Sequence, residues 1–365
     1  MKICQNCFAD EILKSQVITA GKKSNCDVCC IRDDFTYDTE TDDYLIDFFI
    51  PFISIFSPIH KIANSQPGQG TLLKTEVTNN WNIFATKNEV EVYQMLSEIC
   101  KDFFERDPEI LTSTVAVEKM YDSEYVQEFS LIRGSWQDFV EDITYNNRFH
   151  SDKFNKKIFE KYCKSLLKVY QEEKIFYRCR ILESEIGFDK GGIGAPPRGK
   201  TADGRANARG IIILYLGDSE KTTIHETRAG LHDYVCIGKF KLNESIRIID
   251  FKKINEISPF EDGIIDDIAE LAINKRHLQQ IGSEMGKAMR KSDDVLDYLP
   301  TQYISDFVRS IVSEEKPNEY AYQGIEFRSV MNPGGYNLAI FSPDYFDIMD
   351  DLETKKINHI SYEFT

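Results

Sequence analysis

The chain has 365 residues, of which 42% are apolar and 28% are charged, and its formal net charge is −16. This composition is typical of a globular protein of two or three domains, and the acidic balance argues against non-specific nucleic-acid binding, which depends on Lys and Arg. A polar segment containing cysteines stands where the apolar core of a signal peptide would be, and nine cysteines without that signal indicate a reducing compartment. We therefore expect a cytoplasmic protein.

Two pairs of closely spaced cysteines come first along the chain. Cys4 and Cys7 form one C-x-x-C pair, and Cys26 and Cys29 form a second, with Cys30 directly after it. Two such pairs can place four thiolates around one Zn²⁺ ion, and a site with four protein ligands is structural. The spacing predicts a zinc ribbon over residues 1–33 and leaves open whether Cys29 or Cys30 is the fourth ligand.

Residues 44–172 are predicted to be mainly helical. The most apolar run, YLIDFFIPFISIFSPI, is short for a membrane span and is interrupted by Asp47 and Pro51, so it predicts a buried helix or helix pair and no membrane contact. Further apolar residues at helical spacing follow Asn88 and Ser151, whose side chains suit the N-cap position.

The pattern changes near residue 174, where short β-rich segments begin. IFYRCRIL, GIIILYLG, YVCIGKFKL and ESIRIIDF predict strands, a helical block covers residues 263–289, a helix follows DYLP, and GIEFRSV and YNLAIF predict two further strands. The sequence therefore predicts an α+β protein, with a mixed α/β domain over residues 174–355 preceded by the small zinc ribbon and the helical domain.

The stretch GAPPRGKT, residues 194–201, matches the Walker A pattern of phosphate-binding loops. Such a loop needs consecutive main-chain N–H groups, a strand before it and a helix after it. Pro196 and Pro197 have no N–H, and the flanking segments are polar and rich in glycine. We interpret the stretch as an irregular connection that leads to GRAN, residues 204–207, with Lys200 near a phosphate as a point charge.

Several polar residues interrupt the apolar segments of the C-terminal region. They are Arg178 in FYRCR, Arg205 and Asn207 in GRAN, Tyr215 in LYLG, Glu226 in a short helix capped by Asp218 or Ser219, and Ser329 in GIEFRSV. A charged side chain within a strand is unfavourable unless it lines a cleft or is paired. Each residue taken singly also fits a structural or solvent-facing position, so these positions alone leave the function open.

In their order and spacing, the segments FYRCR, GRAN, LYLGDSEKTTIHE, YLPTQYISDFV and GIEFRSVMNPGGYNLAIF resemble the RES-domain family. The resemblance implies a fold similar to that of ADP-ribosyltransferase toxins, and a toxin that binds NAD⁺ as its substrate and cleaves the nicotinamide–ribose bond. It implies catalytic roles for three residues, and we expect four more to contact NAD⁺. The catalytic residues are Arg178, Glu226 and Ser329, and the contacts are Arg205, Tyr215, Asn207 and Lys200.

The chemistry of the reaction fits these residue types. A carboxylate such as Glu226 can stabilise an oxocarbenium-like ribose, guanidinium groups of Arg178 and Arg205 can bind the pyrophosphate, and no metal is needed. Alternatives stay open: hydrolysis, phosphorolysis, protein mono-ADP-ribosylation, or a catalytically inactive zinc-ribbon interaction protein. A role in toxin–antitoxin or anti-phage defence implies an inhibitory partner such as an antitoxin, and we also expect a homo-oligomer.

The sequence departs from the family pattern in two places. GRAN has Ala206 where an aromatic residue is usual, which removes a stacking wall. The helical region looks similar to the HEPN-like extension of some RES proteins but lacks the Arg-x4–6-His ribonuclease signature, so we expect a regulatory or dimerising module. Thr301 and Gln302 in LPTQYI are expected to support the site structurally.

Overall fold

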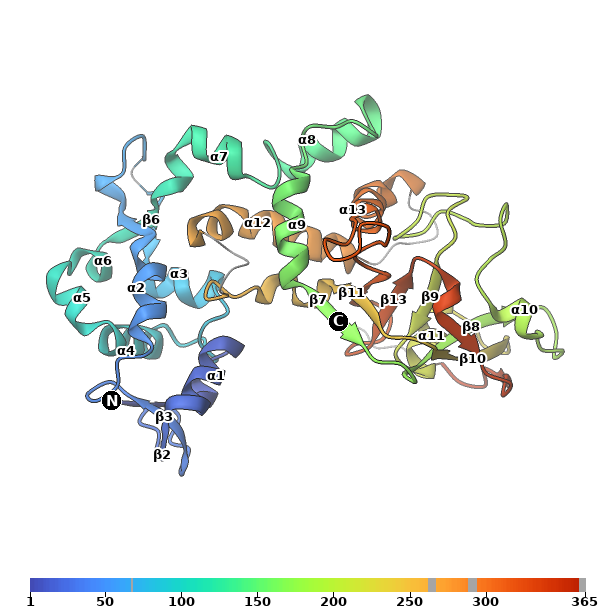
Figure 1. Cartoon of the computed structure of the whole chain (residues 1–365), viewed down its shortest axis with the longest axis horizontal. Helices are drawn as coiled ribbons and strands as arrows, with labels where there is room; N and C mark the ends of the chain where they lie inside the picture. Colours follow the sequence, from blue (N-terminus) through green and yellow to red (C-terminus); the bar gives the residue numbers. More distant parts are fainter. Residues whose placement is uncertain (67, 262–266, 288–293, 361–365) are drawn as a thin grey trace. The chain divides into compact units, whose positions relative to one another are not determined.

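The computed structural model describes residues 1–66, 68–261, 267–287 and 294–360. It is 41% helical and 22% strand, which confirms the α+β class. Two compact units are formed, the first by Met1–Arg133 with Asn255–His277 and the second by Gly134–Ile254 with Leu278–Thr365. This division differs from the three predicted segments because residues 134–172 belong to the second unit and residues 255–277 belong to the first (Figure 1).

The first unit begins with a small antiparallel sheet that carries the paired cysteines. Its strands are ordered β1 (Lys2–Cys4), β3 (Asp34–Asp38) and β2 (Lys22–Ser24). Helix α1 (Glu11–Ala20) starts where the Asp10 carboxylate accepts the N–H groups of Ile12 and Leu13. This cap satisfies two donors that the first turn would otherwise leave without partners.

The rest of the first unit consists of short helices around a second three-stranded sheet. The strands are ordered β4 (Phe56–Pro58), β6 (Thr114–Val117) and β5 (Thr71–Leu72). The helices are α2 (Ile46–Ser54), α3 (Leu73–Asn80), α4 (Glu89–Ile99), α5 (Lys101–Arg106), α6 (Glu109–Thr112) and α7 (Ser123–Phe129). The strands were not predicted, because β5 and β6 have only two and four residues and lie between helical patterns.

Individual helix predictions in this unit have mixed outcomes. The apolar run forms the buried helix α2 and then the strand β4, which confirms the single helix and not the alternative of a helix pair. The N-cap at Asn88 is confirmed, since its side chain accepts the N–H of Val90. The cap at Ser151 is wrong, because Asn155 caps the helix that follows and accepts the N–H of Ile158.

The second unit is built on a nine-stranded mixed sheet. The order along the sheet is β14-β10-β8-β9-β13-β12-β11-β7, and β15 also pairs with β10. The strands are β7 (Leu167–Tyr170), β8 (Ile175–Leu182), β9 (Leu214–Gly217), β10 (Tyr234–Leu242), β11 (Ile246–Asp250), β12 (Gly324–Arg328), β13 (Tyr336–Ile340), β14 (Phe346–Ile348) and β15 (Glu353–Lys356). The helices are α8 (Trp136–Glu141), α9 (Lys156–Ser165), α10 (Lys190–Ile193), α11 (Glu220–Thr227) and α13 (Leu299–Ser310).

Helix α12 (Ile268–Met285) begins in the first unit and ends in the second. It confirms the core of the helical block predicted for residues 263–289, whose two ends lie outside the described residues. The strand β7 was predicted as the end of a helix. It instead pairs antiparallel with β11, so that Ile246 lies opposite Tyr170.

The two faces of the sheet in the second unit differ in their burial. Most of the hydrophobic core lies on one face, where Phe176, Leu216, Phe240 and Leu338 pack together. On the other face α11 contacts β8, and Ile224 of α11 packs against Cys179, Val235 and Ile237. Successive side chains of a strand point to opposite faces, so polar residues next to the core positions face α11.

The edge formed by β7, β11 and β12 holds a buried ionic network. The Glu326 carboxylate is fully buried, and it pairs with the ammonium groups of Lys168, at 2.9 Å, and Lys252. The Tyr170 hydroxyl donates to the same carboxylate at 2.5 Å. Asp250 lies beside it, and burial raises the pKa of Asp250. Because these carboxylates are partnered, we assign the network to the structure of the sheet.

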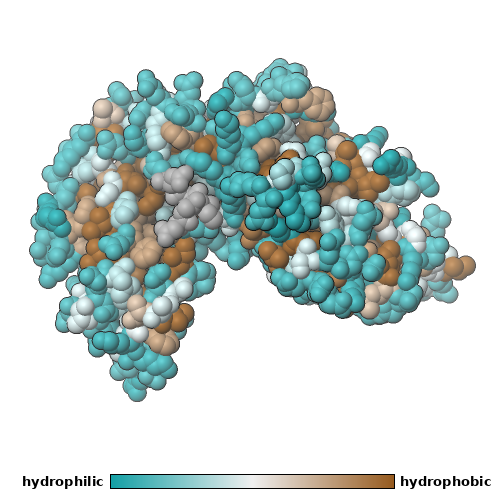
Figure 2. Space-filling model, in the orientation of Figure 1, coloured by the Kyte–Doolittle hydropathy of each residue, from teal (hydrophilic) through white to brown (hydrophobic). Residues whose placement is uncertain are grey.

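The face of the molecule seen in Figure 2 is mainly hydrophilic. Figure 2 shows polar residues over most of the visible face, with hydrophobic residues in small groups between them. Within the described residues, none of the helices combines the length and the apolar character that crossing a bilayer requires.

Candidate functional site

Four cysteines of the first unit form a candidate zinc centre. The Sγ atoms of Cys4, Cys7, Cys26 and Cys29 all lie within 4.8 Å of one another, and three of the separations are 3.3, 3.6 and 3.8 Å. A tetrahedron with Zn–S bonds of about 2.3 Å places its sulfur atoms about 3.8 Å apart. The cluster therefore fits a structural Zn²⁺ ion, and it contains Cys29 and not the adjacent Cys30.

Main-chain N–H groups support this cluster. The Cys26 sulfur accepts the N–H of Cys4 at 3.3 Å and that of Val28 at 3.4 Å. Donors of this kind stabilise the thiolate form of a metal ligand and fix its direction. Cys30 has a φ of 60°, so the chain turns sharply directly after the fourth ligand.

Glu226 lies at the centre of the polar cluster in the second unit. The Ser329 hydroxyl donates to Glu226 Oε1 at 2.6 Å, and the Asn337 side-chain amide donates to the same oxygen at 2.9 Å. Among the described residues, no donor is bound to Oε2. Two nearly buried donors thus fix the carboxylate on one side and leave its second oxygen for a ligand.

These three residues come from separate elements. Glu226 lies in the last turn of α11, which the Ser219 side chain caps by accepting the N–H of Thr222, as the sequence predicted. Ser329 directly follows β12, and Asn337 lies on β13. In the β12–β13 register Asn337 lies opposite Phe327, so the sheet places the two donors close together.

A second set of hydrogen bonds orients Ser329. Its hydroxyl oxygen accepts the N–H of Asn332 at 3.1 Å. The Asn332 amide donates to Thr222 Oγ1 at 2.8 Å, and that hydroxyl donates to Asp218 at 2.6 Å. The main chain at Gly335 lies so close to α11 that a Cβ there would be 2.4 Å from Thr222 Oγ1, which explains the glycine at this position. The MNPGGY loop and α11 therefore hold Ser329 jointly.

Arg205 belongs to the electrostatic surroundings of Glu226. Its guanidinium lies 5.0 Å from the ring centroid of Phe327, and one of its N–H groups donates to the Lys287 carbonyl at 2.5 Å. Burial lowers the pKa of Arg205, and the Glu226 carboxylate opposes this by favouring the charged form. The charges of Arg205 and Glu226 thus interact electrostatically, and a substrate with both anionic and cationic parts needs a cation and an anion in the same site.

The segment GRAN is fixed from both sides. The Tyr215 hydroxyl accepts the N–H of Ala206 at 3.0 Å and donates to Asn207 Oδ1 at 2.8 Å. Burial raises the pKa of Tyr215, so the hydroxyl keeps its proton. From α13, Gln302 Nε2 donates to the carbonyls of Gly204 and Asn207 at 3.0 and 2.9 Å. Gln302 thus has the supporting role expected for it.

Arg178 is not brought to Glu226. It pairs with Gly238 across β8 and β10, on the sheet face of Ile193, whereas the next residue of β8 packs against α11. The guanidinium donates to the carbonyls of Ile193 at 3.0 Å and Tyr215 at 2.8 Å. Burial lowers its pKa to about 10, which leaves it charged at neutral pH. The catalytic role expected of Arg178 stays a prediction, and its observed contacts position β9.

The Walker A match is not a phosphate loop in this fold. Residues 194–213 are irregular, the short α10 precedes them, and β9 follows, so neither the preceding strand nor the following helix is present in this described segment. Lys200 is exposed, and among the described residues its ammonium group has no hydrogen bond or ion pair. Its contact with NAD⁺ stays a prediction.

A sequence model of the RES domain matches residues 176–364, which is more than half of the chain. The chain belongs to the RES domain family. Proteins of this family are generally toxins that act on NAD⁺. Neither the curated proteins nor the solved structures contain a significant match.

Two residues of the site were missed in the sequence. Asn337 stood inside the apolar strand pattern YNLAIF, and Asn332 stood in a loop rich in Gly and Pro. A polar amide within an otherwise apolar strand was the one available signal for Asn337, of the same kind as the signal used for Arg178.

Proposed function

We propose that the second unit binds NAD⁺ and breaks its nicotinamide–ribose bond, so that the protein acts as an NAD⁺-consuming toxin. The observation that carries this proposal is the Glu226 carboxylate, held at Oε1 by Ser329 and Asn337, with no donor bound to Oε2 among the described residues. A carboxylate fixed in this way stabilises positive charge that develops on a sugar ring without having to reorient.

The proposed reaction begins with rupture of the bond between ribose C1′ and the nicotinamide nitrogen. The bonding electron pair leaves with nicotinamide, which becomes neutral, and positive charge develops on the ribose. Glu226 Oε2 faces this charge or a ribose hydroxyl, and Arg205 faces the pyrophosphate. Water then forms the new bond to C1′ and loses a proton to the solvent, which gives ADP-ribose, or an unprotonated oxygen of phosphate forms this bond, which gives the phosphate ester of ADP-ribose.

The test is nicotinamide release from NAD⁺ by the full chain and by Glu226→Gln, which keeps the size of the side chain. Removal of one preorganised electrostatic group lowers the rate by roughly 10²–10³, and we expect a loss of this order. Glu220→Gln on the same helix is the matched control. The Glu220 carboxylate forms an ion pair with the Lys355 ammonium at 2.6 Å and has no contact with Ser329 or Asn337 in the described part of the chain. Turnover that is absent in the wild type, or equal in the two proteins, would refute the proposal.

Product analysis separates the variants of the reaction. Free ADP-ribose indicates a glycohydrolase, an ADP-ribose phosphate ester indicates a phosphorylase, and label on protein without free ADP-ribose indicates a mono-ADP-ribosyltransferase. An unrestrained NAD⁺ consumer would harm its host, so the defence role further requires an inhibitory partner. Co-expression with neighbouring genes that restores growth is the corresponding test of that partner.

A further inference from the structure

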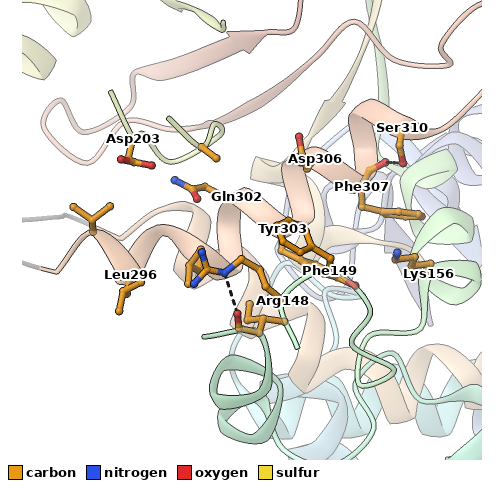
Figure 3. A pocket seen from close by; sticks show the side chains of 14 residues that line it. Arg148, Phe149, Lys156, Asp203, Leu296, Gln302, Tyr303, Asp306, Phe307 and Ser310 are labelled. Carbon is orange, nitrogen blue, oxygen red and sulfur yellow. Dashed lines mark hydrogen bonds between the residues drawn. The ribbon is translucent and has the colours of Figure 1, made fainter. Parts of the chain in front are cut away.

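A cavity of about 360 Å³ lies in the second unit, separate from the Glu226 centre. It runs along one face of α13, where Leu299, Tyr303 and Phe307 recur at helical spacing, and it reaches the segment that precedes α9 (Figure 3). Among the described residues that line it, neither Glu226 nor either of its two donors occurs. Cavities of this size with an apolar and aromatic lining are the usual form of small-molecule sites.

The cavity offers aromatic surfaces to a flat ligand. Phe149 contributes to the lining and is 78% exposed, which is unusual for a large apolar side chain without a partner. Tyr303 contributes to the lining from α13, and its hydroxyl has no hydrogen-bond partner among the described residues. Aromatic faces of this kind bind a planar ring by stacking.

Two cations stand at the same cavity. Arg148 lines it from the chain that follows the π-helical turn Asp142–Asn146, and Lys156 lines it from the first position of α9. The Lys156 ammonium lies 5.7 Å from the ring centroid of Tyr303, and no carboxylate lies within ion-pair distance of it in the described parts of the chain. The Arg148 guanidinium donates to the main-chain carbonyls of Ile143 at 3.3 Å and Thr144 at 3.5 Å. The Lys156 ammonium is therefore the cation that the lining offers to an anion.

The carboxylates of the cavity lie on other elements. Asp306 lines it from α13 and Asp203 from the loop before β9, where Asp203 pairs with Arg209 at 3.3 Å. Asp306 is exposed and has no cationic partner within the described residues, so it is available to accept from a hydroxyl or amino group. The lining therefore suits a ligand that carries both an anionic group and hydrogen-bond donors.

The cavity is joined to the loop that carries Arg205. Gln302 lines the cavity, and its amide is the group that holds the carbonyls of Gly204 and Asn207. Asp203 and Ala208, the residues on either side of GRAN, line the cavity as well. A ligand bound here touches both ends of the loop and its main support.

We propose that this cavity is a regulatory site for a mononucleotide-sized ligand, which combines a flat aromatic ring with a phosphate group, and that occupation of the site fixes the loop carrying Arg205. The phosphate pairs with Lys156, and the ring stacks on Phe149 and Tyr303. The binding step is independent of the proposed NAD⁺ cleavage, whereas the regulatory step rests on it.

The binding step is tested by calorimetry on the full-length wild-type chain with AMP as the probe. We expect a Kd below about 1 mM, and binding at least about tenfold weaker for adenosine and for ribose 5-phosphate, each of which lacks one half of the ligand. Lys156→Gln and Phe149→Ala should each weaken AMP binding about fivefold or more. Lys157→Gln, an exposed neighbour outside the lining, is the matched control and should not change it.

Two outcomes would overturn the binding step. One is the absence of AMP binding at millimolar concentration. The other is binding that survives Lys156→Gln and Phe149→Ala but disappears in Arg205→Ala, which would place AMP in the Glu226 site. Because Phe149 and Lys156 are exposed, their variants are expected to fold, and thermal unfolding checks this.

The regulatory step is tested by NAD⁺ turnover with and without saturating AMP. Allosteric coupling typically changes affinity about fivefold or more, and we expect AMP to lower the KM for NAD⁺ by this amount in the wild type and not in Lys156→Gln. A raised KM would show competition at the substrate site, and an unchanged KM would show no coupling. Either result would contradict the regulatory step and leave the binding step intact. If the wild-type protein shows no NAD⁺ turnover at all, the proposed function is contradicted instead.

Discussion

The hydrogen bond from Asn337 to Glu226 predicts a specific catalytic loss. Asn337 is 7% exposed, and its Nδ2 atom lies 2.9 Å from Glu226 Oε1. A hydrogen bond to a charged group contributes about 1.5–3 kcal/mol, and about 1.4 kcal/mol corresponds to a factor of ten in rate. We therefore expect Asn337→Ala to lower kcat/KM for NAD⁺ by roughly 10- to 100-fold, because the carboxylate loses one of its two orienting donors.

The assay is nicotinamide release at NAD⁺ concentrations below KM, for Asn337→Ala, Ser329→Ala and the double variant. Both residues donate to the same oxygen, so the two losses should not add, and the double-mutant cycle should show a coupling of about 0.5–3 kcal/mol. Asn243→Ala is the matched control, since the Asn243 amide donates to a main-chain carbonyl at the surface. If Asn337→Ala folds with an unchanged Tm and keeps kcat/KM within about twofold, the orientation argument is wrong.

Three further predictions concern other parts of the chain. Metal analysis of the purified protein should find about one zinc per chain, which Cys29→Ser loses and Cys30→Ser retains. Burial beside the Trp81 ring lowers the pKa of Lys275 from 10.5 to about 8. Between pH 8 and pH 10.5 the unfolded state therefore binds more protons at Lys275 than the folded state does. The free energy of unfolding from urea titrations should rise with pH over this range, and Lys275→Met should lack the rise. Lys200→Ala should raise the KM for NAD⁺ at most about fivefold, since the amine is exposed, and complete loss of turnover would instead restore the phosphate-loop interpretation.

Local sequence patterns predicted the parts of the fold that depend on neighbouring residues. The C-x-x-C spacing predicted the cysteine cluster, and short β-rich apolar segments predicted strands such as β8 and β10. The pattern failed for β7, where LKVY continues the apolar spacing of α9 without a helix breaker. Its strand conformation is imposed by pairing with β11, about 80 residues later in the chain, and local propensity does not contain that information.

The site shows the same limit at the level of single residues. Glu226 and Ser329 were named through the resemblance, and the structure brings them together at 2.6 Å, whereas Arg178 was named with them and faces the other side of the sheet. Which face a strand residue occupies depends on the register with its neighbours, and a shift of one residue exchanges the two faces. Order and spacing along the chain therefore identify the segments of such a site, but not which side chains meet in it.

Arg178 remains informative despite this placement. Its guanidinium joins the carbonyl of Tyr215 on β9 to the carbonyl of Ile193, and the Tyr215 hydroxyl in turn holds GRAN at Ala206 and Asn207. Loss of Arg178 would leave two half-buried carbonyls without their donor and remove one of the contacts that position Tyr215, which then loosens the loop that carries Arg205. An effect of Arg178 substitutions on NAD⁺ turnover thus has a physical route through this chain of contacts, without direct contact between Arg178 and the carboxylate.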